Sequence, residues 1–103
     1  MLNPIAARRR YRAARVVAYG VAEEFLASIL KSDFATIVAE HSEDTEEVTR
    51  VGSDGRTYFV DVDLSPDSGG EELRLCVSAD DGGWMAFAPP SASDIIRPPA
   101  ATG

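Results

Sequence analysis

The sequence predicts an α+β domain in which two N-terminal helices pack on one face of a four-stranded antiparallel meander. Two observations predict this fold. Apolar residues recur with helical spacing up to about residue 41, and the spacing then changes to alternation. The alternating segments are separated by clusters of Gly, Pro, Asp and Ser, which are typical of turns. The chain of 103 residues has the length of a single domain, placed at 1–98, with a flexible tail at 99–103.

The first helix is predicted over residues 4–31. Asn3 suits the N-cap and Pro4 the first helical position. One apolar stripe follows the helix, formed by Tyr11, Ala14, Ala18, Val21, Phe25, Leu26, Ile29 and Leu30. A second helix is predicted over 33–41, because Ser32 and Asp33 can cap it and apolar residues recur after them.

The meander is predicted from strands at residues 45–51, 56–64, 71–79 and 84–88. The turns between them are expected at 52–55, 65–70 and 80–83. Pro89–Pro90 should end the regular pattern, since proline cannot donate to a strand ladder. Asp94–Ile96 is then a short apolar return before the tail.

A pairing of Leu64 with Glu71, and of Ala79 with Trp84, sorts the strand residues onto two faces. The core face would hold Tyr58, Val60, Val62, Leu64, Leu73, Leu75, Val77 and Trp84. The second face would hold an apolar patch of Phe59, Cys76, Met85 and Phe87, edged by Asp61, Asp63 and Arg74. Such a patch is rarely left in water, so we expect either Ile95–Ile96 or another chain to cover it.

Charge is divided unevenly along the chain. Residues 1–22 contain five arginines and no acid, whereas residues 23–103 contain all 17 acidic residues and five basic ones. The two parts therefore carry formal charges of +5 and −12, which give the net charge of −7. Opposite fields of this kind steer partners, including copies of the same molecule, so they indicate interaction rather than a reaction.

Composition excludes several classes of protein. Cys76 is the single cysteine, which excludes an intrachain disulfide and favours a reducing compartment, the cytoplasm. The apolar run after Arg15 is too short to span a membrane. It continues into Glu23 without a small-residue cleavage site, so we interpret the N-terminus as mature protein.

Two acidic motifs resemble metal sites. Asp61 and Asp63 have the spacing of a DxD metal-binding pair, but we favour an ion pair between Asp61 and Arg74 on neighbouring strands. Asp80–Gly83 contains the residues of a calcium loop without the rest of its pattern, and a hairpin turn is favoured. We therefore expect no metal and no cofactor.

The remaining reactive side chains favour structural roles. His41 lies where the second helix should end, a position that suits a histidine without any reaction. Cys76 lies among apolar neighbours in a strand and is interpreted as a small packed residue. No catalytic arrangement of residues is found, so the sequence predicts a protein that is not an enzyme.

The arginines near the N-terminus are the strongest candidate for function. Arg8, Arg12 and Arg15 fall on one face of the first helix. They could pair with an acidic protein surface, in the same chain or in a homodimer, or form a solvated helix start. Contact with nucleic acid ranks below both, because the acidic body repels polyanions. An acidic cluster is interpreted as a solvated face, with docking of a basic partner as the alternative: Glu40, Glu43, Asp44, Glu46 and Glu47.

Residues 33–98 resemble small uncharacterised bacterial α+β domains. The resemblance rests on the D-D-G-G-W turn at Asp80–Trp84 and on the Phe-x-Pro at Phe87–Pro89. Domains of similar shape include NTF2-like folds and the immunity proteins of bacterial toxin systems. The resemblance implies a helix-then-sheet fold and supplies no catalytic residues.

These observations lead to one expected function and two alternatives. The expected function is non-enzymatic binding of another protein, as an immunity-type or accessory protein. The alternatives are an NTF2-like domain with a small-molecule pocket near Tyr58 and Trp84, and nucleic-acid contact through the arginines. The candidate interaction residues are Arg8, Arg12, Arg15, Phe59, Met85 and Phe87.

Overall fold

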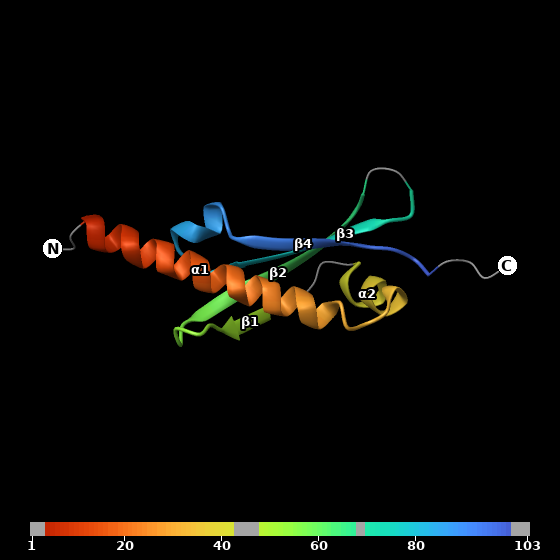
Figure 1. Ribbon diagram of the computed structural model, residues 1–103, viewed down its shortest axis with the longest axis horizontal. Helices are drawn as coiled ribbons and strands as arrows, with labels where there is room; N and C mark the ends of the chain where they lie inside the picture. The colour runs from red at the N-terminus through yellow and green to blue at the C-terminus, as the bar shows by residue number, and fades with distance from the viewer. Residues whose placement is uncertain (1–3, 43–47, 68–69, 100–103) are drawn as a thin grey trace.

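The computed structural model describes residues 4–42, 48–67 and 70–99, with side chains from Arg9 onward except that of Trp84. The elements are helices α1 (Pro4–Ile29) and α2 (Phe34–His41), strands β1 (Val48–Val51), β2 (Thr57–Pro66), β3 (Leu73–Asp80) and β4 (Ser91–Ile96), and the 3₁₀ helix η1 (Trp84–Phe87). The strands form an antiparallel sheet in the order β1-β2-β3-β4. Helix α1 lies along the sheet and contacts β3 and β4, and α2 contacts β2 (Figure 1). The predicted fold class is therefore confirmed.

Helix α1 begins at the predicted residue, and α2 begins one residue after the predicted start. Helix α1 begins at Pro4, and α2 follows the N-cap Asp33, whose carboxylate accepts a hydrogen bond from the Thr36 amide at 2.8 Å. The hydrogen bonds from Thr36 lower the pKa of Asp33. Helix α1 ends at Ile29, two residues before the predicted end, and the Ser32 amide donates to the Ile29 carbonyl.

The turn between β1 and β2 lies at the predicted residues. The Gly52 amide donates to the Arg56 carbonyl at 2.8 Å, and Gly55 has a φ of +80°, a backbone conformation that favours glycine. The next turn lies further along the chain than predicted, because Ser65 and Pro66 continue β2. Leu64 consequently pairs with Leu75 instead of Glu71. This displacement by an even number of residues leaves every side chain of β2 and β3 on its predicted face.

The predicted strand at 84–88 is wrong, because these residues form η1 and the fourth strand is β4. Two local turns direct the chain out of the sheet after β3. The carboxylate of Asp80 accepts from the Gly82 amide at 2.7 Å, and that of Asp81 accepts from the Gly83 amide at 3.0 Å. The prolines precede β4 instead of ending the sheet, and the Pro90 carbonyl accepts from the Ala79 amide at 3.1 Å. This position needs no amide donor from the proline.

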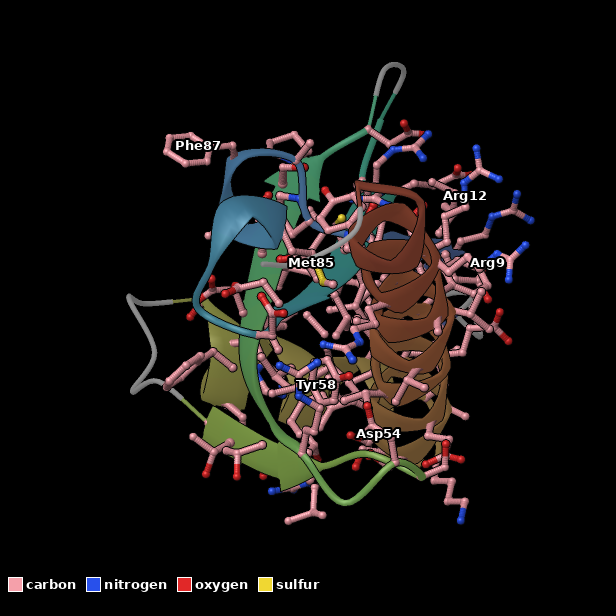
Figure 2. The ribbon with its side chains drawn as sticks, turned by 90° about the vertical axis from the view of Figure 1, so that its left-hand side faces the viewer. Arg9, Arg12, Asp54, Tyr58, Met85 and Phe87 are labelled. Atoms are coloured by element: carbon pink, nitrogen blue, oxygen red, sulfur yellow. The ribbon has the colours of Figure 1, made fainter. Side chains whose placement is uncertain are left out.

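The core lies between the helices and one face of the sheet. Tyr58 and Met85 are fully buried there, between α1 and the strands (Figure 2). The other buried residues of the hydrophobic core, among the side chains that the structure describes, are Ala14, Ala18, Val21, Ala22, Leu26, Ile29, Ile37, Val60, Leu75, Val77, Ala79 and Ile96. Most of the predicted core-face residues are therefore buried or half-buried, and the Trp84 side chain lies outside the described part of the chain.

The predicted apolar patch on the second face does not form. Met85 is buried in the core, whereas Phe87 is 84% exposed on η1. Phe59 is half-buried, and its ring lies beside Gly82. The register sets Asp61 opposite Ser78, so the expected pair between Asp61 and Arg74 is also wrong. The second face is mainly polar, with Asp61, Asp63, Cys76, Ser78, Ser91 and Ser93 along it. The predicted patch is absent from this face because residues 84–88 lie outside the sheet.

Candidate interaction surface

Helix α1 is longer than the core against which it packs. Its first buried side chain among those described is Ala14, and the side chains from Arg9 to Ala13 are all exposed. The N-terminal end of α1 reaches past η1, away from the sheet (Figure 1). The segment from Pro4 to Ala13 is about 15 Å long at the helical rise of about 1.5 Å per residue. Within the part whose side chains are described, this end of the molecule therefore presents a helix with exposed residues only.

The arginines of α1 fall into two groups. Arg9 and Arg12 point into solvent on the side of α1 away from the sheet (Figure 2). Arg15 is half-buried, and its Nη1 donates to the Ala88 carbonyl at 2.7 Å. Its guanidinium also lies 5.8 Å from the centre of the Tyr11 ring. Arg15 thus holds α1 against the end of η1. The arginines predicted to share one face of the helix therefore have different surroundings: Arg12 lies in solvent, and Arg15 contacts Ala88. The Arg8 side chain lies outside the described side chains.

A shallow groove of about 470 Å³ separates α1 from the start of β4. It is lined by Arg15, Val16, Tyr19, Pro89, Pro90 and Ser91, which we call the α1–β4 surface. Val16 is 72% exposed and Tyr19 is 47% exposed. A hydrogen bond with Glu23, together with its negative charge, raises the pKa of the Tyr19 hydroxyl. The groove therefore combines exposed apolar side chains with polar groups at its edges.

The α1–β4 surface adjoins an edge of the sheet that we call free, because no further strand pairs with β4 within residues 4–42, 48–67 and 70–99. Ala79 and Pro90 form a hydrogen-bonded pair, and bonded pairs alternate along an antiparallel ladder. The amides of Ala92 and Asp94 therefore point towards β3, and those of Ser91 and Ser93 point outward. The outward amide of Ile95 donates to its neighbour, the Asp94 carboxylate, at 2.8 Å.

Sequence reasoning did not identify this surface as a candidate. Val16 and Tyr19 lie off the apolar stripe that predicts the core side of α1. Apolar residues outside that stripe could have indicated an exposed apolar surface on the helix. Pro89, Pro90 and Ser91 carried no such signal, because the strand was expected before them. Of the predicted interaction residues, only Arg15 lines the groove.

A second hollow, of about 230 Å³, lies on the opposite flank of α1 beside β1. It is lined by Val21, Glu24, Phe25, Ser28, Arg50 and Val51. The Arg50 guanidinium lies 4.9 Å from the centre of the Phe25 ring. A cation and an aromatic ring at this separation attract each other, so Arg50 links β1 to α1.

Tyr58 has a structural role, in the core and at the turn between β1 and β2. Its ring is fully buried, and its hydroxyl donates to the Asp54 carboxylate at 2.8 Å. Burial raises the pKa of Tyr58 to about 12, and the hydrogen bond and the charge of Asp54 act in the same direction. Desolvation of the Asp54 carboxylate works to raise its pKa, but hydrogen bonds from Tyr58 and the Arg56 amide outweigh this effect and lower the pKa. The pair fixes the turn between β1 and β2.

The remaining sequence candidates are dispersed. Asp61 and Asp63 are exposed on the polar face of the sheet, and Cys76 is half-buried opposite Asp63. The Nε2 atom of His41 lies 3.8 Å from a Glu40 carboxylate oxygen. Within residues 4–42, 48–67 and 70–99, no three His, Cys, Asp or Glu side chains gather as metal ligands would. Most of the predicted acidic cluster, Glu43, Asp44, Glu46 and Glu47, lies outside the described residues.

The structure defines this protein as an α+β domain, and comparisons with known proteins place it in no narrower class. No protein-family model, curated protein or solved structure matches the chain. The resemblance to NTF2-like and immunity-type domains therefore stays a prediction. Among the described residues, no helix combines the length and the apolar character that crossing a membrane requires.

Proposed function

We propose that this protein acts by binding another protein through the α1–β4 surface, without catalysing a reaction. The observation that carries the proposal is the exposure of Val16 and Tyr19 beside the free edge of β4. Single exposed apolar residues are ordinary, but here they adjoin an edge strand with outward-pointing amides. An edge strand beside a groove is a common arrangement for binding an extended segment of another chain.

Charge supports a partner that is acidic near the N-terminal end of α1. Arg9 and Arg12 extend from this end into solvent, and Arg15 lines the groove. Arginine is enriched in protein interfaces, where its guanidinium can donate several hydrogen bonds at once. The same arginines are weaker evidence for nucleic acid as the partner, because the rest of the chain has a formal charge of −12 and repels polyanions.

Site-specific photo-crosslinking in the native cells tests this proposal. A photoreactive amino acid is placed at Val16, and a matched control is placed at Thr49, which is exposed on β1 at the other edge of the sheet. We expect a discrete crosslinked protein product from position 16 and none from position 49. Equal products from the two positions, no product, or a product that contains nucleic acid would contradict the proposal.

A further inference from the structure

The free edge of β4 can accept a strand from a second copy of the chain. The outward amides of Ser91 and Ser93 lie two residues apart, which is the repeat of an antiparallel ladder. In a two-fold arrangement, Ser91 of each copy faces Ser93 of the other. The Ile95 amide then keeps its hydrogen bond to Asp94. Such pairing would join the two sheets into one and remove an exposed edge from each copy.

The same symmetry axis brings the two α1 helices side by side. Helix α1 and strand β4 run in the same direction, from the N-terminal end of the molecule towards the other end (Figure 1). Copies related by a two-fold axis beside β4 therefore carry their α1 helices antiparallel, on the same face of the joined sheet. The exposed side chains of Val16 and Tyr19 lie on the flank of α1 nearest to β4, so they face the partner.

Charge favours this antiparallel arrangement. Arg9 and Arg12 are exposed at the N-terminal end of α1. Asp33 and Glu40 are exposed at the other end, around α2, with Lys31 between them and α1. A two-fold arrangement directs the basic end of each α1 towards the end of the other copy that carries α2, which packs on β2. Complementary charges of this kind guide association and fix orientation.

We propose that the partner at the α1–β4 surface is a second copy of this chain, paired antiparallel along β4, an inference that rests on the binding function proposed above. Each copy directs its basic α1 end towards the α2 end of the other, where Asp33 and Glu40 are exposed. The homodimer thereby gives a physical role to the basic N-terminal end of α1, because this end of each copy is directed towards exposed acidic residues of the other.

A charge exchange between the two ends tests the arrangement. One variant carries Arg9→Glu and Arg12→Glu, and the other carries Glu40→Arg; all three residues are exposed, so both variants should fold. Light scattering across a dilution series should give the wild type a mass of twice 11.0 kDa. Each variant alone should dissociate at a concentration about tenfold higher than the wild type. An equal mixture of the two should recover the wild-type behaviour, because both of its end-to-end contacts join opposite charges.

A substitution on the edge of β4 tests the strand pairing. Ser93→Pro removes an outward amide and leaves the bonds from Ala92 and Asp94 to β3, whereas Ser93→Thr retains the amide and is the control. We expect only the proline variant to become monomeric. A monomeric wild type, or a charge mixture no tighter than its components, overturns the homodimer. If a crosslink at Val16 then joins a different protein, the binding function stands without the homodimer; without any such crosslink, both proposals fail.

Discussion

Gly52 lies where α1, the first turn of the sheet and the Tyr58 ring meet. A Cβ atom at this position would lie 2.6 Å from Val17 Cγ1 and 2.7 Å from Tyr58 Cε2. Both distances are well below an ordinary contact between carbon atoms. The glycine is therefore required for the close approach of the turn to the helix. Gly20 differs, because a Cβ atom there would have no neighbour within 4 Å.

Replacing these two glycines with alanine should have opposite effects on stability. Gly52→Ala should lower the free energy of unfolding by about 1–3 kcal/mol, because the packed neighbours must move. Gly20→Ala should raise it by about 0.5–1 kcal/mol, because alanine is the better residue within a helix. Urea unfolding followed by circular dichroism measures both. A Gly52→Ala variant as stable as the wild type would show that the turn does not pack on α1 as described.

The Tyr58 hydroxyl makes protein stability depend on pH in the alkaline range. Its pKa is raised in the folded state to about 12 from an ordinary value of 10.0. The folded protein therefore holds this proton more tightly than the unfolded chain does. The stabilising contribution is complete below pH 10 and is lost as the pH rises towards 12.

Tyr58→Phe should change both stability and its dependence on pH. At pH 8 the variant should be less stable by about 1 kcal/mol, because it lacks the hydrogen bond to Asp54. Between pH 8 and pH 11 it should lose less stability than the wild type, since the group that titrates is gone. Tyr19, whose pKa is also raised, is present in both proteins and cancels from the comparison. Parallel pH profiles for the two proteins would refute this assignment.

At the scale of elements, the segment from Trp84 to Ala88 shows how a local pattern can mislead. Its apolar residues suit a strand, and the preceding Asp and Gly residues suit a hairpin. The carboxylates of Asp80 and Asp81 instead close two successive turns on the amides of Gly82 and Gly83. Helix η1 follows, so Met85 enters the core and Phe87 faces outward.

Truncation of these two side chains distinguishes η1 from a strand. Met85→Ala should lower the free energy of unfolding by about 2–5 kcal/mol, because it leaves a cavity in the core. Phe87→Ala should cost much less, about 0.5 kcal/mol, because that side chain is 84% exposed. A strand with the expected register would put both residues on one face, so their effects would be similar. Chemical denaturation of both variants under one condition decides the question.

At the scale of the molecule, α1 has two parts, which differ in how far tertiary contacts stabilise them. From Ala14 to Ile29 the helix packs on the sheet, and before Ala14 its described side chains face solvent. Short helical segments without tertiary contacts are only marginally stable in water. Arg15 lies at the boundary, where its hydrogen bond to Ala88 joins the helix to η1. The N-terminal turns are therefore the part of α1 that a partner would stabilise most.

Amide hydrogen exchange should reveal this difference along α1. Amides of residues 9–13 should exchange at least tenfold faster than those of residues 18–29, because their opening exposes no buried side chain. If the homodimer forms, dilution to the monomer should increase the difference. Mass spectrometry or NMR can measure both. Uniform protection along the helix at every concentration would contradict the division of α1 into two parts.

Local chemistry was sufficient to predict much of the fold. Helix spacing and the cap at Asp33 located α1 and α2, and alternation located β2 and β3. The register between β2 and β3 was displaced, yet the core face survived because a displacement by an even number preserves the pleat. The candidate surface was predictable only in part. Arg15 was identified from charge, but its partner Ala88 is 73 residues away in the sequence.

The sequence by itself determined the fold class, the helices, the core face of the sheet and the division of charge. These features depend on residue spacing and composition over short stretches, where propensity and periodicity act. Only the tertiary structure decided which strand closes the sheet, where Met85 and Phe87 lie, and that Val16 and Tyr19 adjoin the edge of β4. Those features depend on which distant segments compete for the same space in the core, and a local pattern does not contain that competition.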